Sequence, residues 1–234
     1  SDGTYYYIPD NWSDEIFENN VRQEYNLSVS GASDKMNYYM SAGYLDDQGI
    51  VPNSGFQRYS ARLKADYQVK PWLKLGANVS FTHYDSREQD TEGGTSNANI
   101  FYASNIMGAI YPMYIRDAQG NIMTDNRGFQ RYDYGKKGQD TNGSRNTIPN
   151  ANPLASYMLD KMKYSGDVVS GKWFADVDIW GGIKAKVNIG VDANNVRNTD
   201  MVNPFYGQYS ETTGVGGLIS VSPNVHSVLI SSIY

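Results

Sequence analysis

Two runs of strictly alternating apolar and polar residues, separated by only three residues, most constrain how this chain can fold. The first run, 58–69, places Tyr, Ala, Leu and Val at odd positions and Arg, Lys, Asp, Ser and Gln at even positions. After the KPW of 70–72, the second run, 73–82, repeats the alternation. Because successive side chains of a β-strand point to opposite sides, each run predicts a strand with one apolar and one polar face.

Similar alternation recurs along the chain. It is clear at 25–31, 37–45, 169–179 and 183–193, and weaker at 216–234. Between these strands, short and long connections alternate: the short ones are 32–36, 70–72 and 180–182, and the long ones are 46–55, 85–167 and 195–217. In an up-and-down antiparallel sheet, this places all tight turns at one end and all long loops at the other.

Transmembrane β-barrels have the same asymmetry between short turns and long extracellular loops. Their strands need about 9–11 residues to cross the hydrocarbon layer, whereas strands of soluble proteins most often have about 5–6. Tyr67, Trp72 and Trp180 stand beside the tight turns, where an aromatic girdle lies in such barrels. We therefore interpret the chain as an all-β, antiparallel, up-and-down segment of a transmembrane β-barrel, with the apolar face toward lipid and the polar face toward a wet lumen.

Two alternatives stay open from the residues alone. A soluble β-sandwich that binds carbohydrate could bury the apolar face in a core, and it predicts that Ala61, Leu63, Val79, Val187 and Ile189 interdigitate. A passive porin would share the barrel and lack a plug. About seven strands are fewer than the eight of the smallest closed barrels, and unpaired edges in hydrocarbon cost several kcal/mol per group. If the sheet lies in a membrane, we expect it to be part of a larger barrel.

A resemblance to a known family is carried by several spaced elements in one order. NWSDEIF (11–17) precedes YNLSVSG (25–31), NYYMSAGYLDDQGIV (37–51), FQRYSARL (56–63) and WLKLG (72–76). In this order and spacing, residues 11–83 resemble the SusC/RagA family of TonB-dependent outer-membrane transporters. Residues 100–195 resemble that family more loosely.

The resemblance implies a barrel of about 22 strands that holds an N-terminal plug and is energised through a TonB box. Residues 1–234 would form part of the barrel domain, without the plug and TonB box, and 85–167 would be a long extracellular loop insertion. The family imports large nutrients, namely glycans or oligosaccharides and sometimes peptides, across the outer membrane of Gram-negative Bacteroidetes. A SusD/RagB-like surface lipoprotein closes over the barrel as a lid.

The long insertion carries the candidate ligand contacts. They are five tyrosines in segments that also contain Asn and Asp: Tyr102, Tyr111, Tyr114, Tyr132 and Tyr134. Their rings could stack on sugar faces while amides and carboxylates bind hydroxyls, so we predict that they contact substrate or partner. The alternative is that they pack the loops together. The stretch 96–110 predicts a short helix with Ser96 as N-cap, and DAQGN (117–121) predicts a small hairpin.

Nothing in the sequence indicates an enzyme. The two histidines lie far apart, and no G-x-S-x-G, H-E-x-x-H or Walker-type motif occurs. His83 falls in the apolar register at a strand end, so we expect an interfacial ring rather than a ligand. The acidic stretches LDDQG and RDAQGN fit turns better than calcium loops. The absence of cysteine excludes thiolate metal sites, and the net charge of −5 argues against a nucleic-acid partner. We expect no cofactor and no metal site.

Overall fold

The computed structural model describes residues 9–87, 99–135, 145–149, 151–201 and 219–233. Within these ranges the chain forms three short helices and seven strands. In chain order they are α1 (Trp12–Ile16), β1 (Arg22–Ala32), β2 (Met36–Gln48), β3 (Gly55–Lys70), β4 (Leu73–Arg87), α2 (Ile100–Ile106), α3 (Pro153–Leu159), β5 (Lys161–Trp180), β6 (Ile183–Met201) and β7 (Ile219–Ile233).

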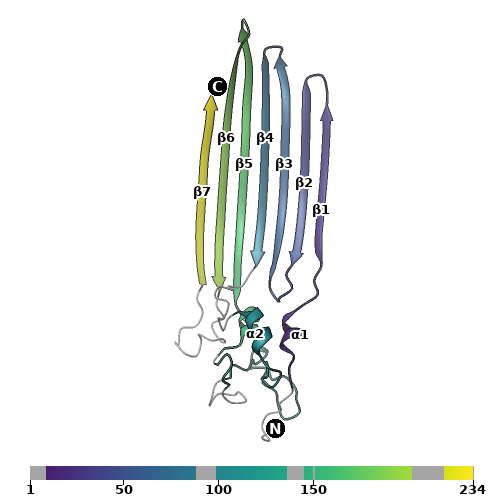
Figure 1. Cartoon of the computed structure of the whole chain (residues 1–234), viewed down its shortest axis with the longest axis vertical. Helices are drawn as coiled ribbons and strands as arrows, with labels where there is room; N and C mark the ends of the chain where they lie inside the picture. The colour runs from purple at the N-terminus through teal and green to yellow at the C-terminus, as the bar shows by residue number, and fades with distance from the viewer. Residues whose placement is uncertain (1–8, 88–98, 136–144, 150, 202–218, 234) are drawn as a thin grey trace.

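The seven strands form one antiparallel sheet in which every strand pairs with its neighbours in sequence, in the order β1-β2-β3-β4-β5-β6-β7. The predicted up-and-down topology is confirmed. The turns that join β1 to β2, β3 to β4 and β5 to β6 lie at one end, and the helices lie at the other (Figure 1). We call these the turn end and the cap end. The strands range from 11 residues in β1 to 20 residues in β5. All are longer than the strands of soluble proteins, which most often have about 5–6 residues.

Several strands extend beyond their runs of alternation. β5 begins at Lys161 rather than at Val169, because the residues before Val169 pair with β6 on one side and largely with β4 on the other. β4 likewise continues to Arg87. The connection between the two strands therefore covers 88–160 rather than 85–167.

The turn between β5 and β6 follows directly from its sequence. Gly181 and Gly182 have φ values of 63° and 86°. A two-residue type I′ turn requires positive φ at both central residues, and glycine adopts this conformation without steric cost. The very short WGG connection is thus the tight turn that the alternation predicted.

Cross-strand register gives the sheet two chemically different faces. One row across β1 to β6 consists of Leu27, Ala42, Ala61, Phe81, Val169 and Ala193, and the adjacent row consists of Ser28, Ser41, Arg62, Ser80, Ser170 and Asp192. We call the side of the first row the apolar face and the side of the second row the polar face. The two faces predicted from the sequence are confirmed.

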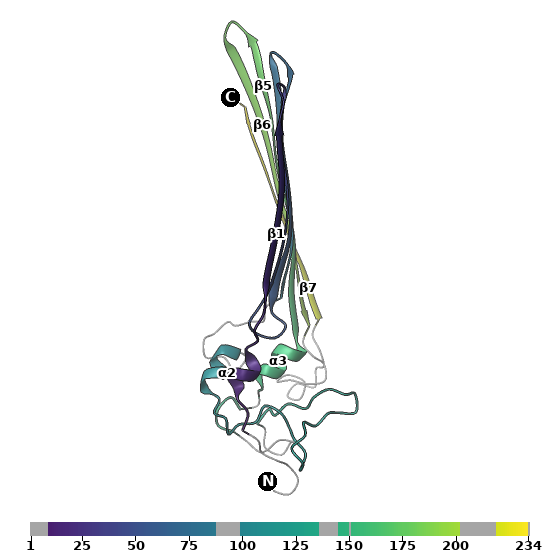
Figure 2. The same cartoon turned by 90° about the vertical axis from the view of Figure 1, so that its right-hand side faces the viewer.

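Nothing covers the apolar face within the described part of the chain. Leu27 is 70% exposed, Met40 52% and Leu63 45%. Turned nearly edge-on, the sheet is a single layer (Figure 2). The sandwich alternative, which required these side chains to interdigitate in one core, is therefore wrong for this structure.

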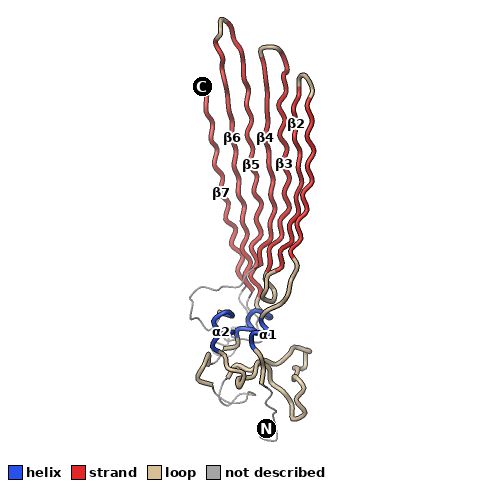
Figure 3. Tube along the Cα trace, turned by 45° about the vertical axis from the view of Figure 1, so that its right-hand side comes forward, coloured by secondary structure: helices blue, strands red, loops and turns tan. Residues whose placement is uncertain are grey.

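The buried core lies instead in a small lobe at the cap end, which we call the cap. It combines residues 9–17 with most of the connection between β4 and β5, and it stands below the strands in Figure 3. Trp12 and Ile16 of α1 are almost completely buried against Ile100 of α2 and Leu154 of α3. Trp12 Nε1 also donates a hydrogen bond to the Tyr111 carbonyl at 2.9 Å. Packing across sequence-distant segments thus builds the cap.

Each cap helix begins at an asparagine. The side chains of Asn11, Asn99 and Asn152 accept hydrogen bonds from backbone N–H groups in the first turns of α1, α2 and α3. The helix predicted within 96–110 is present, but its predicted N-cap is wrong. Asn99 caps the helix, and Ser96 lies outside the described residues.

Candidate functional site

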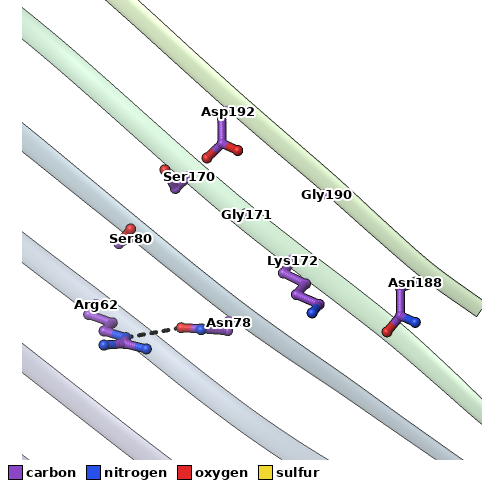
Figure 4. Close-up of a pocket in the computed structure, with 9 residues that line it drawn as sticks. All are labelled: Arg62, Asn78, Ser80, Ser170, Gly171, Lys172, Asn188, Gly190 and Asp192. Atoms are coloured by element: carbon purple, nitrogen blue, oxygen red, sulfur yellow. Dashed lines mark hydrogen bonds between the residues drawn. The ribbon is translucent and has the colours of Figure 1, made fainter. Parts of the chain in front are cut away.

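The polar face carries a hollow of about 340 Å³ across β3 to β6. Its lining, drawn in Figure 4, consists of Arg62, Asn78, Ser80, Ser170, Gly171, Lys172, Asn188, Gly190 and Asp192. We call it the polar-face hollow. All but Gly171, which contributes backbone, occupy polar-face positions of the alternating pattern.

Differences in side-chain length create the hollow. Ser80, Ser170 and Gly190 rise little above the backbone, whereas Arg62 and Lys172 are long. In register, Arg62 on β3 and Asp192 on β6 stand at opposite ends of a row whose middle is Ser80 and Ser170. The floor is therefore shallow and hydroxyl-lined, with a cation at one side and an anion at the other.

Hydrogen bonding orients one of the two cations. Arg62 Nε donates to Asn78 Oδ1 at 3.0 Å, which holds the guanidinium along the sheet. Lys172 adds three N–H donors, and Asp192 adds only acceptors. This set of donors and acceptors can bind hydroxyl, amide or carboxylate groups of a polar ligand without any covalent chemistry.

A second charged group lies toward the turn end of the polar face. The ring of Phe174 covers Gly76, and the ammonium groups of Lys74 and Lys186 lie 5.8 and 5.4 Å from its centroid. Lys74 Nζ is 3.7 Å from the carboxylate of Asp66. The absence of a side chain at Gly76 lets the aromatic ring lie flat between the two cations.

The five tyrosines predicted to contact a ligand all lie in the cap. Tyr114, Tyr132 and Tyr134 are buried, and Tyr102 and Tyr111 pack against the same core. The rings of Tyr114 and Tyr132 are 5.3 Å apart, and burial raises the pKa of both phenols. Their position agrees with the packing alternative, and contact with substrate or partner stays a prediction.

Several TonB-dependent receptors are similar to this chain in sequence. No protein-family model matches the chain. TonB-dependent receptor SusC of Bacteroides thetaiotaomicron is 33% identical over 88 residues, which is 37% of this chain and 9% of the relative. TonB-dependent receptor P39 of Formosa agariphila is 30% identical over 94 residues, 40% of this chain and 9% of the relative. TonB-dependent receptor P3 of that organism is 24% identical over 214 residues, 88% of this chain and 18% of the relative.

Solved structures show the same fold. The RagAB peptide importer in the open-open state has a TM-score of 0.65 and 24% identity, covering 88% of this chain and 21% of that chain. The RagAB peptide transporter has a TM-score of 0.63 and 23% identity, covering 95% of this chain and 23% of that chain. The chain is a SusC/RagA-like segment. It spans less than a fifth of these curated relatives and less than a quarter of these solved chains.

The SusC/RagA-like segment also carries aromatic residues on its polar face, outside the five predicted tyrosines. Phe56 and Tyr164 share a row near the cap end, and Tyr84 stacks on Phe56 with ring centroids 5.9 Å apart. The Tyr84 ring also covers Gly166. The signal that could have found them is an aromatic residue at a polar-face position of an alternating strand.

His83 lies on the apolar face, as its register predicted. Its ring centroid is 6.3 Å from that of Tyr59, and its Nδ1 is 2.7 Å from Asp167 Oδ1. The part of the chain that the structure describes holds no grouping of three or more His, Cys, Asp or Glu side chains arranged for a metal. No helix among the same residues is long and apolar enough to cross a membrane.

The predicted DAQGN hairpin is confirmed. The Asp117 N–H donates to the Asn121 carbonyl at 3.0 Å, and Arg116 pairs with Ile122 in an antiparallel bridge. The Asp117 carboxylate accepts further hydrogen bonds from the N–H groups of Gln119 and Asn121. Its role here is turn formation.

Proposed function

We propose that the SusC/RagA-like segment is part of the barrel wall of a TonB-dependent importer in the outer membrane of a Bacteroidetes-type bacterium. Its apolar face contacts lipid, and its polar face lines the path of the nutrient. One observation carries this proposal: an uncovered apolar band is bounded at both ends by aromatic rings. A soluble protein gains nothing from leaving such a band in water.

The band is comparable in height to the apolar band of a transmembrane barrel. At the cap end it is bounded by a row of rings, Tyr25, Tyr44, Tyr59 and His83, whose successive centroids are 6.4, 5.0 and 6.3 Å apart. We call this the aromatic row. At the turn end stand Tyr67, Trp72 and Trp180, of which Trp180 is 86% exposed. Eight steps along β3 separate Tyr59 from Tyr67, about 26 Å at roughly 3.3 Å per residue. With strands tilted by about 35–45°, this is about 20 Å along the membrane normal, and the wider apolar band of transmembrane barrels is about 25 Å tall.

The remainder of the barrel would come from the rest of a longer chain. β1 and β7 form the two edges of the sheet. In hydrocarbon, their unpaired backbone groups would cost several kcal/mol each, so both edges need further strands. A closed barrel of about 22 strands with an N-terminal plug and TonB box would provide these strands. The cap then lies at the extracellular mouth.

The polar face supports a role in import. The polar-face hollow and the aromatic group of Phe56, Tyr84 and Tyr164 offer hydrogen bonds and stacking surfaces along one wall, without a catalytic group. The cargo is a large nutrient, a glycan or oligosaccharide or a peptide, handed over by a SusD/RagB-like lipoprotein lid. The plug is displaced through TonB. The similarity to TonB-dependent receptors SusC and P39 and to the RagAB peptide importer supports this assignment.

Fractionation of cells that express the full-length protein tests the membrane placement. We expect recovery in the outer-membrane fraction, with slower electrophoretic migration after boiling, as folded barrels show. Recovery in the soluble fraction would contradict the proposal. Uptake of labelled oligosaccharides and peptides then tests import. Deletion of the TonB box should abolish uptake, whereas a passive porin would retain it.

A further inference from the structure

Beyond the aromatic row, cations gather on the apolar-face side of β4, β5 and β6. Arg197 on β6 lies one row further toward the cap end, opposite Ser165. Arg87 on β4 and Lys163 on β5 lie opposite each other in the next row. All three side chains are exposed, and they come from three adjacent strands. We call this group the basic rim.

The basic rim retains unneutralised positive charge. Lys163 Nζ is 3.1 Å from Asp85 Oδ1, and that carboxylate also accepts a hydrogen bond from Ser165. Among the described residues, neither Arg87 nor Arg197 makes an ion pair. Lys161 adds a further exposed cation two residues before Lys163 on the same side of β5. Among the described residues of β4 to β6 on this side, two carboxylates, Asp85 and Asp167, stand beside four cations, and Asp167 also pairs with His83. These cations therefore outnumber the carboxylates beside them.

The height of the rim places it among lipid headgroups. One row corresponds to two residues, so Arg197 is about 7 Å and the Arg87 row about 13 Å beyond the aromatic row along the strands. The distance along the membrane normal is smaller, because barrel strands tilt by about 35–45°. The polar interfacial layer adds about 5–8 Å on each side of the hydrocarbon, and long Arg and Lys side chains reach into it.

From this juxtaposition we infer that Arg87, Lys163 and Arg197 bind the phosphate of an anionic lipid headgroup on the outer surface of the barrel. The inference rests on the proposed placement of the apolar face in a membrane. Guanidinium groups bind phosphate oxygens bidentately, and Lys163 provides a point charge beside them. The acyl chains continue onto the apolar band below the aromatic row. A free anion would have no such continuation, so the ligand is the lipid.

Native mass spectrometry of the full-length protein from vesicles of phosphatidylcholine and phosphatidylglycerol tests the inference. We expect wild-type protein to retain phosphatidylglycerol in preference to phosphatidylcholine. The triple variant R87Q/K163Q/R197Q should lose about tenfold or more of this preference, since each surface cation contributes about fivefold in affinity. R58Q/K64Q/K184Q removes the same charge from the polar face and should bind lipid like wild type. R87K/R197K keeps the charge but not the bidentate geometry, and should retain only part of the preference.

Each alternative outcome contradicts the lipid site. Equal retention of both lipids by wild-type protein would overturn it, and so would equal losses in the triple variant and its polar-face control. Displacement of phosphatidylglycerol by millimolar inorganic phosphate would show that the rim recognises a free anion instead. Recovery of protein in the vesicles is measured first. A protein that fails to insert contradicts the membrane placement, whereas one that inserts without lipid preference contradicts only the basic rim.

Discussion

The guanidinium of Arg116 lies 3.0 Å from the carboxylate of Asp10, and 106 positions separate the two residues in sequence. The second carboxylate oxygen of Asp10 accepts a hydrogen bond from the Met113 N–H at 2.7 Å. Both charged side chains are mostly buried. The segment that precedes β1 is thereby fastened to the connection between β4 and β5, and the cap becomes one unit.

Replacement of Asp10 by alanine should loosen the cap without unfolding the sheet. The change leaves the Arg116 guanidinium largely buried without its anion, a loss that costs about 3 kcal/mol in comparable pairs. Hydrogen exchange on the full-length protein should accelerate at residues 99–117 and stay unchanged in β2 and β3. Glu18→Gln, an exposed change in the same segment, is the control. Unchanged exchange in the Asp10 variant would mean that the apolar core alone holds the cap.

A charge in the middle of the apolar band should impair folding in the membrane. Leu63→Arg places a cation at mid-band, where arginine costs about 2–4 kcal/mol in membrane barrels. We expect less folded, heat-modifiable protein in the outer membrane. Thr82→Arg introduces the same side chain on the polar face of the neighbouring strand and should fold normally. Equal yields of the two variants would argue against lipid contact at Leu63.

A large residue in the polar-face hollow should slow uptake without affecting assembly. Ser170→Trp places an indole on the hollow floor, and we expect about a tenfold fall in uptake, equivalent to about 1.4 kcal/mol. Ala193→Trp puts the same ring on the apolar face of β6, where lipid accommodates it. Outer-membrane abundance is measured for both variants. Normal uptake by Ser170→Trp would exclude the hollow from the nutrient path.

Gly76 and Phe174 should behave as a coupled pair. A Cβ on residue 76 would overlap the Phe174 ring, so Gly76→Ala must displace the ring from between Lys74 and Lys186. We expect a loss of about 1–3 kcal/mol in thermal or denaturant unfolding of the full-length protein. In the double variant Gly76→Ala/Phe174→Ala, part of that loss should disappear, because the overlap is removed. Strictly additive losses would show that the two residues act independently.

The hairpin at Asp117 should loosen in acid. Hydrogen bonds from the side chain and backbone of Asn121 lower the pKa of the Asp117 carboxyl below its usual 3.8. Since the folded state favours the carboxylate, its stabilisation is present above pH 3.8 and is lost as the pH falls through the lowered pKa. Exchange of the Asn121 amide should accelerate in that window. Asp117→Asn should remove this pH dependence. Identical pH profiles of Asn121 exchange in the wild type and the variant would contradict the prediction.

Much of the sheet could be predicted because its signal is local. Alternation with a period of two assigned Arg62, Ser80 and Ser170 to one face and Leu63 to the other, and WGG indicated a tight turn. Alternation also predicts that Arg62 and Asp192 of the polar-face hollow face the lumen. The sequence does not predict that these residues line one hollow, because that depends on the register of four strands.

The packing of the cap could not be predicted from the sequence, because its contacts join residues that are distant in the chain. Tyr114 and Tyr132 resemble exposed loop tyrosines in sequence, and only the fold buries them against Trp12 and Ile16. Asn99 replaced Ser96 as the N-cap because the neighbouring core determines where α2 can start. The onset of β5 at Lys161 depends on pairing with β4 and β6 rather than on its own residues.

The sequence by itself determined that the chain forms long antiparallel strands with one apolar and one polar face, since side-chain alternation follows from strand geometry alone. Tertiary structure alone decided three things: that no second layer formed by the described residues covers the apolar face, that the tyrosines pack a cap, and that Arg87, Lys163 and Arg197 gather at one rim. Each depends on which sequence-distant segments become neighbours, and only strand pairing and tertiary packing determine that.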